Sequence, residues 1–453
     1  PGFPALPKQQ ALERTNAAVG ARRPFQRPLI NVTFKEGVNK FRGHQRACQL
    51  CGDCVSGCNY AAKNTVLMNY LPEAKRHGAE LFTETSVRFV TRESNEWVVR
   101  FDRTGSGRPT FSAPPLTVRA PVVVLAAGTL GSTEILLRSR EEGKLSLSAC
   151  LGRGFTGNGD VFALAYNGTE PIDGVGAGFR RPDLHHQVGP CITGMIDLRS
   201  ADRKDEQIII EEGSIPGALS GVIPFLLGVA NFLWGRPSAG PDNRTLVQEV
   251  TRWSRYLAGA YHGAVRRTQT LLAMAHDNSG GSLRLVDDRV RVEWPGLESQ
   301  PIYPLIYEKL RTVSRSLQAT HIGNPFRLVT VHPLGGCCMG KDATTGVVDH
   351  ECRVFDGEAG TSVHPDLYVC DGSIVPRPLG ANPLLTISAV AERAAERLIG
   401  RENVRLPGPA IAPPPAPTFK PMFYERAKPG LEFTEHMTGE FAWVGDQEER
   451  RPV

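Results

Sequence analysis

The chain has 453 residues, of which 41% are hydrophobic and 22% charged, a globular composition that excludes a disordered, collagenous or coiled-coil protein. This length predicts two or three domains, or one large two-part enzyme fold. The net charge of +5 is small beside 52 basic and 47 acidic residues, so we expect no nucleic-acid partner.

The first forty residues are only weakly periodic and predict a connecting segment over 1–40. The chain begins Pro1-Gly2-Phe3, with neither Met nor a basic-then-apolar leader, so no signal peptide is visible. We therefore expect a cytoplasmic or membrane-associated protein.

Four cysteines then stand close together in the chain: Cys48, Cys51, Cys54 and Cys58. Their spacing equals the bacterial ferredoxin run that wraps an iron–sulfur cluster, although Asn59 replaces the proline of that run. Four thiolates would also suit zinc. An iron–sulfur cluster, a zinc site and packed or paired thiols are the three alternatives for this group.

The run Val122–Ala127 is continuously apolar, as in a strand buried on both faces, and leads through a Gly-rich turn into the helical sequence EILLRSREEG. This is one βα unit of an α/β sheet, and we assign 41–160 to its domain. A formal GxGxxG occurs at 152–157, but the strand-like DVFALAYN follows it. A dinucleotide fingerprint must instead open a helix, so we reject this match.

Residues 161–340 predict a second domain with a substantial antiparallel sheet. Strand-like pieces occur at 207–211 and 289–294. One predicted helix keeps an apolar face through Ile306, Leu310, Val313 and Leu317.

The uncharged run 213–235 is long enough to span a bilayer, although prolines and glycines interrupt it. A buried or lid-like segment and a loop that enters a membrane surface are the other readings of this run.

The α/β pattern returns over 341–402. A short apolar strand at 367–370 precedes Asp371-Gly372-Ser373, and a helix with one apolar face follows Gly380-Ala381-Asn382-Pro383. Seven prolines between 404 and 421 indicate a linker. We expect 403–453 to be this linker and a truncated tail.

Two loops carry the strongest chemical signals. His332 lies in HPLGG, and histidine is the side chain best suited to move protons near neutral pH. Asn382 offers a donor and an acceptor just before the last helix. With 123–143, 151–160, 331–340 and 367–398 in this order, the chain resembles the glucose–methanol–choline (GMC) family of flavin alcohol oxidoreductases, in its cholesterol oxidase-like branch.

The resemblance implies an α/β (α+β overall) fold: an incomplete FAD-binding Rossmann-like domain and a substrate domain with an antiparallel or mixed sheet. His332 and Asn382 match the pair that positions the substrate hydroxyl beside FAD. Glu211 matches a carboxylate that moves a proton during double-bond migration in a 3-ketosteroid. The neighbouring Glu212 is an alternative for that role, and two solvated surface acids are another.

The resemblance also implies a set of FAD-contacting residues: Gly128, Gly157, Asn158, Gly159, Asp371, Gly372, Pro383 and Thr386. The family's pyrophosphate-binding GxGxxG is missing from the sequence. The intact chain or a second polypeptide is expected to supply it.

The leading functional hypothesis is FAD-dependent oxidation of a bulky alcohol, most of all a sterol 3β-hydroxyl, with the apolar run 213–235 as a peripheral membrane contact. One alternative is a dehydrogenase of another bulky alcohol that passes electrons through an iron–sulfur cluster at Cys48–Cys58. Another is a non-catalytic fragment or subunit. The family fixes the chemistry more firmly than the substrate.

Overall fold

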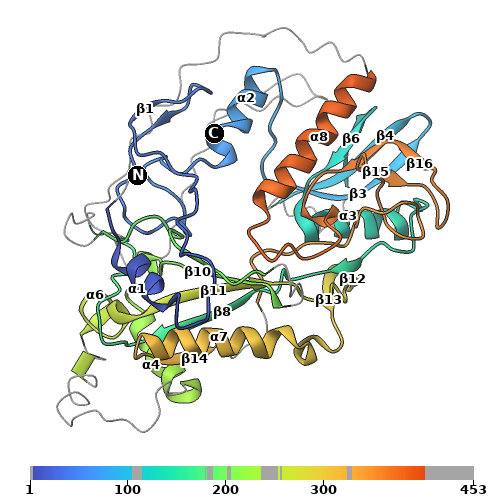
Figure 1. Cartoon of the computed structure of the whole chain (residues 1–453). Helices are drawn as coiled ribbons and strands as arrows, with labels where there is room; N and C mark the ends of the chain where they lie inside the picture. Colours follow the sequence, from blue (N-terminus) through green and yellow to red (C-terminus); the bar gives the residue numbers. More distant parts are fainter. Residues whose placement is uncertain are drawn as a thin grey trace. The chain divides into compact units, whose positions relative to one another are not determined.

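The computed structural model describes residues 4–104, 115–178, 180, 187–200, 206–235, 254–255, 258–323 and 329–402. All of them belong to one compact unit, Pro1–Thr418. Helices accompany one sheet with parallel pairing and several antiparallel sheets, which confirms the predicted mixed fold (Figure 1). The predicted linker and tail at 403–453 lie outside the described residues.

One sheet contains three strands: β15 (Arg353–Phe355), β16 (Val363–Val369) and β6 (Val123–Leu125). Two of these strands are followed in the chain by a helix: α3 (Gly128–Glu141) after β6 and α8 (Leu384–Glu402) after β16 (Figure 1). Strands β6 and β16 are parallel, with Leu125 opposite Val369, and both residues lie in a buried apolar core with Leu136 of α3. The predicted βα unit is confirmed, and the carboxyl ends of β6 and β16 lie side by side.

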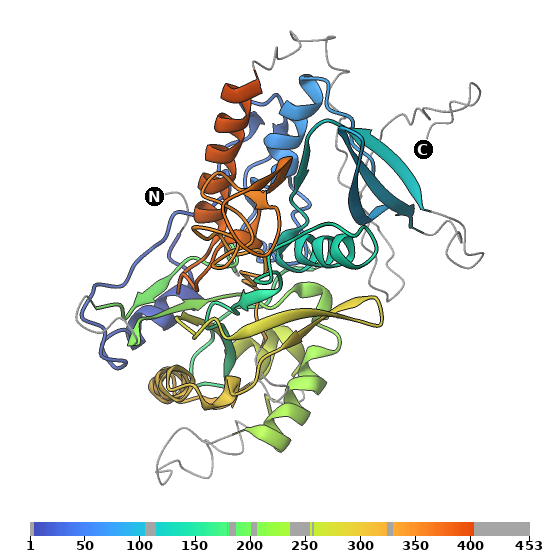
Figure 2. The same cartoon turned by 90° about the vertical axis from the view of Figure 1, so that its right-hand side faces the viewer.

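A three-stranded antiparallel sheet packs beside α3 (Figure 2). It consists of β3 (Thr85–Glu93), β4 (Glu96–Arg103) and β5 (Leu116–Ala120). Trp97 of β4 and Val90 of β3 are completely buried in the same core as Leu136. This sheet therefore extends the α/β core.

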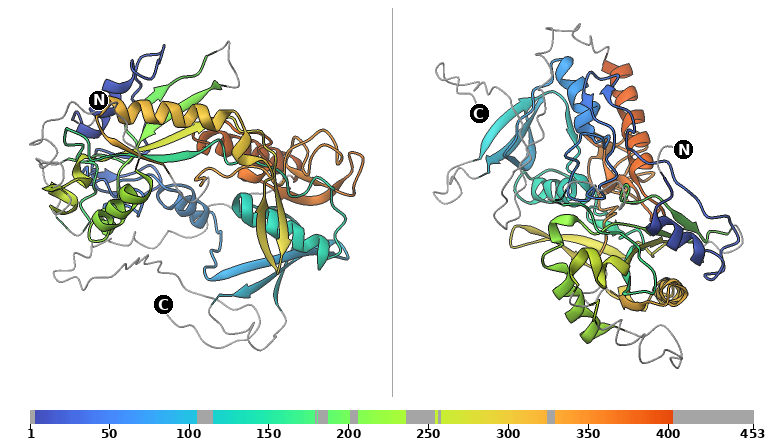
Figure 3. Two further views of the ribbon diagram at one scale, coloured as in Figure 1. Left: turned by 90° about the horizontal axis from the view of Figure 1, so that it is seen from below. Right: turned by 90° about the vertical axis from the view of Figure 1, so that its left-hand side faces the viewer.

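A second large sheet has five antiparallel strands, in the order β14 (Thr320–Gly323), β8 (Val161–Tyr166), β11 (Gln269–Ala275), β10 (Ile208–Glu212) and β9 (Met195–Asp197). Two helices cover one face of this sheet: α1 (Pro7–Thr15) and α7 (Ile302–Ser316). Ile208 and Ile210 of β10 both face these helices, because side chains two residues apart lie on the same side of a strand. Helix α7 lies below the sheet in Figure 1 and runs along it in Figure 3.

The predicted apolar face of α7 is confirmed, because Ile306, Leu310 and Val313 are all completely buried. The rejected GxGxxG at 152–157 does not open a helix. Its centre is a strand, β7 (Arg153–Phe155), which pairs with β12 (Gly281–Val286), the neighbour of β13 (Arg289–Glu293).

The uncharged run 213–235 forms a helix, α4 (Ile223–Trp234), whose side chains are largely exposed. Phe225 is 74% exposed and Phe232 87% exposed, whereas Leu227 is buried against α6 (Gly259–His262) and its surroundings. No helix within the described ranges is both long and apolar enough to span a bilayer. A fully buried segment is also wrong for this run, because the apolar side chains of α4 face outward.

The remaining short elements are β1 (Gly37–Val38), β2 (His44–Gln45), η1 (Val66–Met68), α2 (Tyr70–Arg76), η4 (Gly217–Leu219), η6 (Val265–Arg267), η7 (Leu297–Ser299) and η8 (Gly372–Ile374).

Candidate active site

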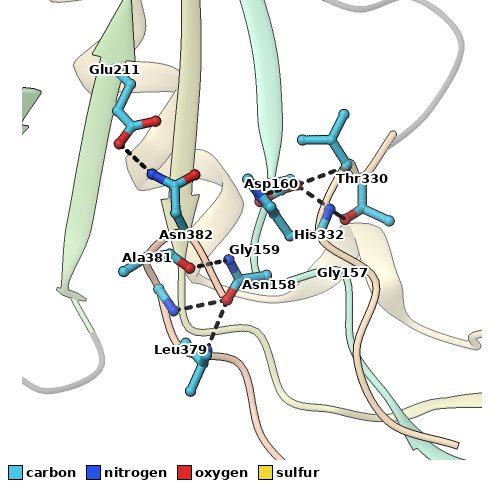
Figure 4. A network of polar contacts seen from close by, with 12 residues as sticks. Gly157, Asn158, Gly159, Asp160, Glu211, Thr330, His332, Leu379, Ala381 and Asn382 are labelled. Carbon is cyan, nitrogen blue, oxygen red and sulfur yellow. Dashed lines mark hydrogen bonds and ion pairs between the residues drawn. The ribbon is translucent and has the colours of Figure 1, made fainter. Parts of the chain in front are cut away.

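A buried carboxylate holds His332. The Nδ1 atom of His332 lies 3.0 Å from Oδ2 and 3.2 Å from Oδ1 of Asp160 (Figure 4). Asp160 stands immediately before β8 with its side chain fully shielded, whereas 15% of the His332 side chain is exposed. The Oδ2 atom of Asp160 also accepts hydrogen bonds from the Thr330 hydroxyl at 3.0 Å and the Val331 amide at 2.9 Å. These contacts fix the orientation of the imidazole ring.

The amide of Asn382 points at a buried carboxyl group on β10 of the five-stranded sheet. Its Nδ2 donates to Oε1 of Glu211 at 2.6 Å, and Glu211 is only 1% exposed (Figure 4). The Glu211 Oε2 atom is buried and has no hydrogen-bond partner among the described residues. Burial raises the pKa of Glu211 from 4.5 to about 7, against the lowering effects of Asn382 and His332. This carboxyl group can therefore gain or lose a proton near neutral pH.

Glu212 faces the opposite side of β10, as adjacent strand residues must. Its Oε2 accepts from Lys8 Nζ at 2.5 Å, and both side chains are completely buried. Its Oε1 accepts from the Thr193 amide at 2.7 Å and from the Thr193 hydroxyl. The alternative of two solvated surface acids is wrong, and Glu211 is the member of the pair that meets Asn382.

Gly157, Asn158 and Gly159 lie between the His332 and Asn382 loops (Figure 4). The Asn158 Nδ2 donates to the Ala381 carbonyl at 3.0 Å, and its Oδ1 accepts from the amides of Leu379 and Gly380 at 2.8 and 2.9 Å. Asn158 is completely buried in a left-handed conformation, with φ 57°. Its amide is thus occupied by the loop before Asn382, and contact of these three residues with FAD stays a prediction.

Asp371 joins the ends of the two parallel strands. Its Oδ2 accepts from the Gly128 amide at 3.0 Å and from the Ser132 hydroxyl, and its Oδ1 accepts from the Ser373 amide at 2.8 Å. Ligands of open α/β sheets bind beside the carboxyl ends of such strands. The structure therefore brings Gly128, Asp371 and the adjacent Gly372 together at a suitable edge.

The four clustered cysteines line one narrow cavity with Tyr60 and Lys63. All four are free thiols, and burial raises the pKa of Cys48 to about 11 and that of Cys51 to about 12. No three His, Cys, Asp or Glu side chains in the described residues are placed to hold a metal ion. The described residues thus give no support to an iron–sulfur or zinc site.

The sequence did not indicate the role of Asp160 or the tethering role of Asn158. The only local signal was a carboxylate at the end of Gly-Asn-Gly-Asp, directly before the apolar strand VFALAY. A charge at the start of a buried strand requires a partner, and that partner stands 172 residues later in the chain.

Two profiles of the GMC oxidoreductase family match the chain, over residues 22–144 and 240–391. A cholesterol oxidase of Mycobacterium tuberculosis is 31% identical over 376 residues, which cover 77% of this chain and 58% of that protein. A cholesterol oxidase of Acinetobacter baumannii is 26% identical over 86% of this chain and 70% of its own length. The chain belongs to the GMC oxidoreductase family.

Among solved structures, pyridoxine 4-oxidase from Mesorbium loti aligns with a TM-score of 0.48 and 16% identity, over 88% of this chain and 72% of that one. The chain spans about three fifths of the length of the mycobacterial relative, with 58% covered.

The family is one of FAD-binding proteins, and the residues present fit the ring end of that cofactor. A Cβ atom added at Gly128 would meet no atom within 4 Å, so a ligand can approach its backbone. Leu384 and Leu385, which follow Asn382 and Pro383, are 60% and 80% exposed. An uncovered apolar surface that directly follows Asn382 and Pro383 in the chain suits a large flat ring. Thr386 is also exposed, whereas Pro383 is buried.

Substitution of Glu211 by glutamine should change the pH dependence of stability. Because the pKa of Glu211 is raised in the folded state, the stability that this group contributes is fully present below about pH 4.5. It is lost as the pH rises through about 7. Glutamine cannot ionise, so Glu211→Gln should gain on the order of 3 kcal/mol over the wild type between pH 4.5 and pH 8. Urea unfolding of both proteins at these two pH values measures the difference. A difference independent of pH would contradict the raised pKa.

Proposed function

We propose that the protein oxidises an alcohol to a ketone or aldehyde with bound FAD. The observation that carries this proposal is the meeting of His332, Asn382 and Glu211 beside the open edge of the α/β sheet, in a chain of the GMC family. When bound, FAD supplies the acceptor for the hydride that leaves the alcohol carbon.

The side chains of this site divide the remaining work. His332 is in place to accept the hydroxyl proton, because a hydride leaves readily only when that proton leaves as well. Asn382 is held by Glu211 at 2.6 Å, so its amide can orient the hydroxyl. With a pKa of about 7, Glu211 can both accept and return a proton, which suits migration of a double bond next to the new carbonyl.

A sterol 3β-hydroxyl is the substrate that we propose. Glu211 stands directly opposite Leu272 on β11, and Leu272 stands opposite Phe162 on β8, so the three share one face of the sheet. Phe162 is 43% exposed on that face. Phe162 and Leu272 thus form an apolar surface that leads to the carboxyl group of Glu211. Such a surface suits a substrate with a rigid apolar body and a single hydroxyl. The cholesterol oxidases among the relatives support the same choice.

The exposed helix α4 is the membrane contact in this proposal. Its outward side chains include Phe225, Leu226, Phe232 and Leu233, each at least half exposed. Sterols reside in membranes, and aromatic and aliphatic side chains on a short uncharged helix can enter the boundary between headgroups and acyl chains. This contact would shorten the path of the substrate from the bilayer to the enzyme.

A pyrophosphate-binding segment completes the proposed enzyme, from the intact chain or a second polypeptide. Strand β6 pairs with one neighbour, β16, in the described sheet. The other edge of β6 can pair with a further strand, and the β6 residue Val124 is 46% exposed.

The test is the anaerobic visible spectrum of the full-length protein before and after adding cholesterol in phosphatidylcholine vesicles. Bleaching of the flavin bands is expected. Bleaching by other bulky alcohols but not by cholesterol would retain the oxidation and overturn the sterol substrate. A full-length protein without flavin would overturn the enzyme altogether and favour a non-catalytic subunit.

The variant Phe232→Asp tests the membrane contact in the same assay. It should slow bleaching by vesicle-bound cholesterol and leave bleaching by detergent-dissolved cholesterol unchanged, because only delivery is impaired. Equal rates with vesicles for variant and wild type would exclude α4 as the contact.

A further inference from the structure

The segment Thr156–Asp160 connects the two catalytic loops. At one end, the Thr156 amide and carbonyl exchange hydrogen bonds with Leu334, each at 3.0 Å, two residues after His332. At the other end, Asp160 contacts the His332 ring. Between them, Asn158 makes three hydrogen bonds to residues 379–381, directly before Asn382. One short buried segment therefore sets the positions of both His332 and Asn382.

We propose that Asp160 is a positioning residue that keeps the proton of neutral His332 on Nδ1, so that Nε2 is free to accept the proton of the alcohol. This inference rests on the proposed function. In the step, the O–H bond of the alcohol breaks and an N–H bond forms at Nε2, which leaves a positively charged imidazolium.

The contacts of Asp160 indicate which ring nitrogen of His332 carries the proton. A carboxylate offers acceptors only, and both oxygens of Asp160 lie within 3.2 Å of Nδ1. The Oδ2 atom already accepts from the Thr330 hydroxyl and the Val331 amide, so these two donors hold the carboxylate in place. The Nδ1 atom must therefore be the donor in its contact with Asp160. The lone pair of neutral His332 is then on Nε2, where a base needs it.

Asp160 also provides a negative charge beside the His332 ring, which becomes positive in the proposed step. Its side chain is completely shielded from solvent, and an ion pair is screened far less there than at a surface. When Nε2 takes the hydroxyl proton, the new imidazolium faces this fixed negative charge. The pair thus favours the protonated state of the base during the reaction, in addition to orienting the ring.

Asn158 gives the second half of the alignment. Its side-chain amide makes three hydrogen bonds to backbone groups of one loop, and its left-handed φ of 57° is a conformation that a non-glycine residue seldom adopts. Asp277 supports the same segment by accepting from the Thr156 hydroxyl at 2.7 Å and from the amides of Gly157 and Gly159 at 3.0 Å. Asp197 on β9 is the matched control, because its side chain is also completely shielded and is held by Arg23 and Arg199, not by the segment Thr156–Asp160.

The first experiment measures the His332 tautomer by ¹⁵N NMR of the full-length protein labelled at histidine, without substrate. The His332→Gln variant assigns the signal by its loss. At a pH where His332 is neutral, we expect the proton on Nδ1. A wild-type proton on Nε2 would overturn the inference. This readout requires no turnover, so it separates the inference from the proposed function, which fails if no alcohol reduces the flavin.

The second experiment compares Asp160→Asn with Asp197→Asn. The first variant removes the charge beside His332 with little change of shape, so flavin reduction by saturating alcohol should slow about a hundredfold while KM changes little. The second should lower the midpoint of urea unfolding and keep the wild-type tautomer. Reduction by Asp160→Asn within about threefold of the wild type, or an equal loss in both variants, would contradict the role of Asp160. If Asp160→Asn does not fold, the wild-type tautomer alone decides.

Discussion

Replacement of His332 by alanine is expected to slow alcohol oxidation at least about a hundredfold in the full-length, FAD-loaded protein, which is the usual contribution of a positioned base. The reason is geometric: Nδ1 is occupied by Asp160, and the ring is partly exposed at the site. The measurement is the rate of anaerobic flavin bleaching at saturating alcohol. The flavin content of the variant must be determined first, so that loss of cofactor is not counted as loss of chemistry.

His364→Ala is the matched control for this variant. His364 is buried, its Nε2 contacts the Ser146 carbonyl at 2.6 Å, and its ring meets Trp97 edge to face within the α/β core. Its removal should cost stability and leave the bleaching rate per bound flavin unchanged. Turnover of His332→Ala that is close to normal, or a similar slowing in both variants, would exclude His332 as the proton acceptor.

The local periodicity of the sequence was sufficient for several elements of the fold. The apolar run at 122–127 contains β6 and leads into α3, and the face through Ile306, Leu310 and Val313 is buried on α7. These features depend on which residues along one short stretch meet the core, so they can be predicted from that stretch alone. The HPLGG and GANP loops were found from their residue types and carried the family resemblance, and the segment Thr156–Asp160 contacts both of them.

The partners of the catalytic side chains could not be predicted in this way. Asp160 and His332 stand 172 residues apart, and Glu211 and Asn382 stand 171 apart. Such contacts depend on how strands from distant segments align. Sequence alone also left open which of Glu211 and Glu212 enters the site, because a shift of one residue in β10 would exchange them.

The cysteine spacing alone could not decide among the three alternatives for this group, for a related reason. A metal site requires thiols that converge on one point, and the backbone between the cysteines decides where each thiol points. In this loop Leu50, Gly52 and Gly57 have positive φ values of 55°, 80° and 117°. These conformations redirect the chain between successive cysteines, so the C-x2-C-x2-C-x3-C spacing does not define the positions of the thiols.

Replacement of Lys8 by methionine should strongly destabilise the packing of α1 on the five-stranded sheet. Lys8 lies on α1 and Glu212 on β10, and both side chains are completely buried at an N–O distance of 2.5 Å. Removal of one partner leaves an uncompensated buried charge, which typically costs about 3–5 kcal/mol. The midpoint and slope of urea unfolding at pH 7 provide the measurement.

The double variant Lys8→Met, Glu212→Gln distinguishes lost charge pairing from lost packing. Glutamine retains an oxygen for the Thr193 amide, which donates to Glu212 at 2.7 Å, and it removes the unpaired charge. The double variant should therefore recover most of the stability that Lys8→Met loses. Equal loss in both would show that the packing of the lysine chain, and not its charge, is what matters. Because Glu212 anchors one face of β10, this pair also keeps Glu211 on the other face, where it meets Asn382.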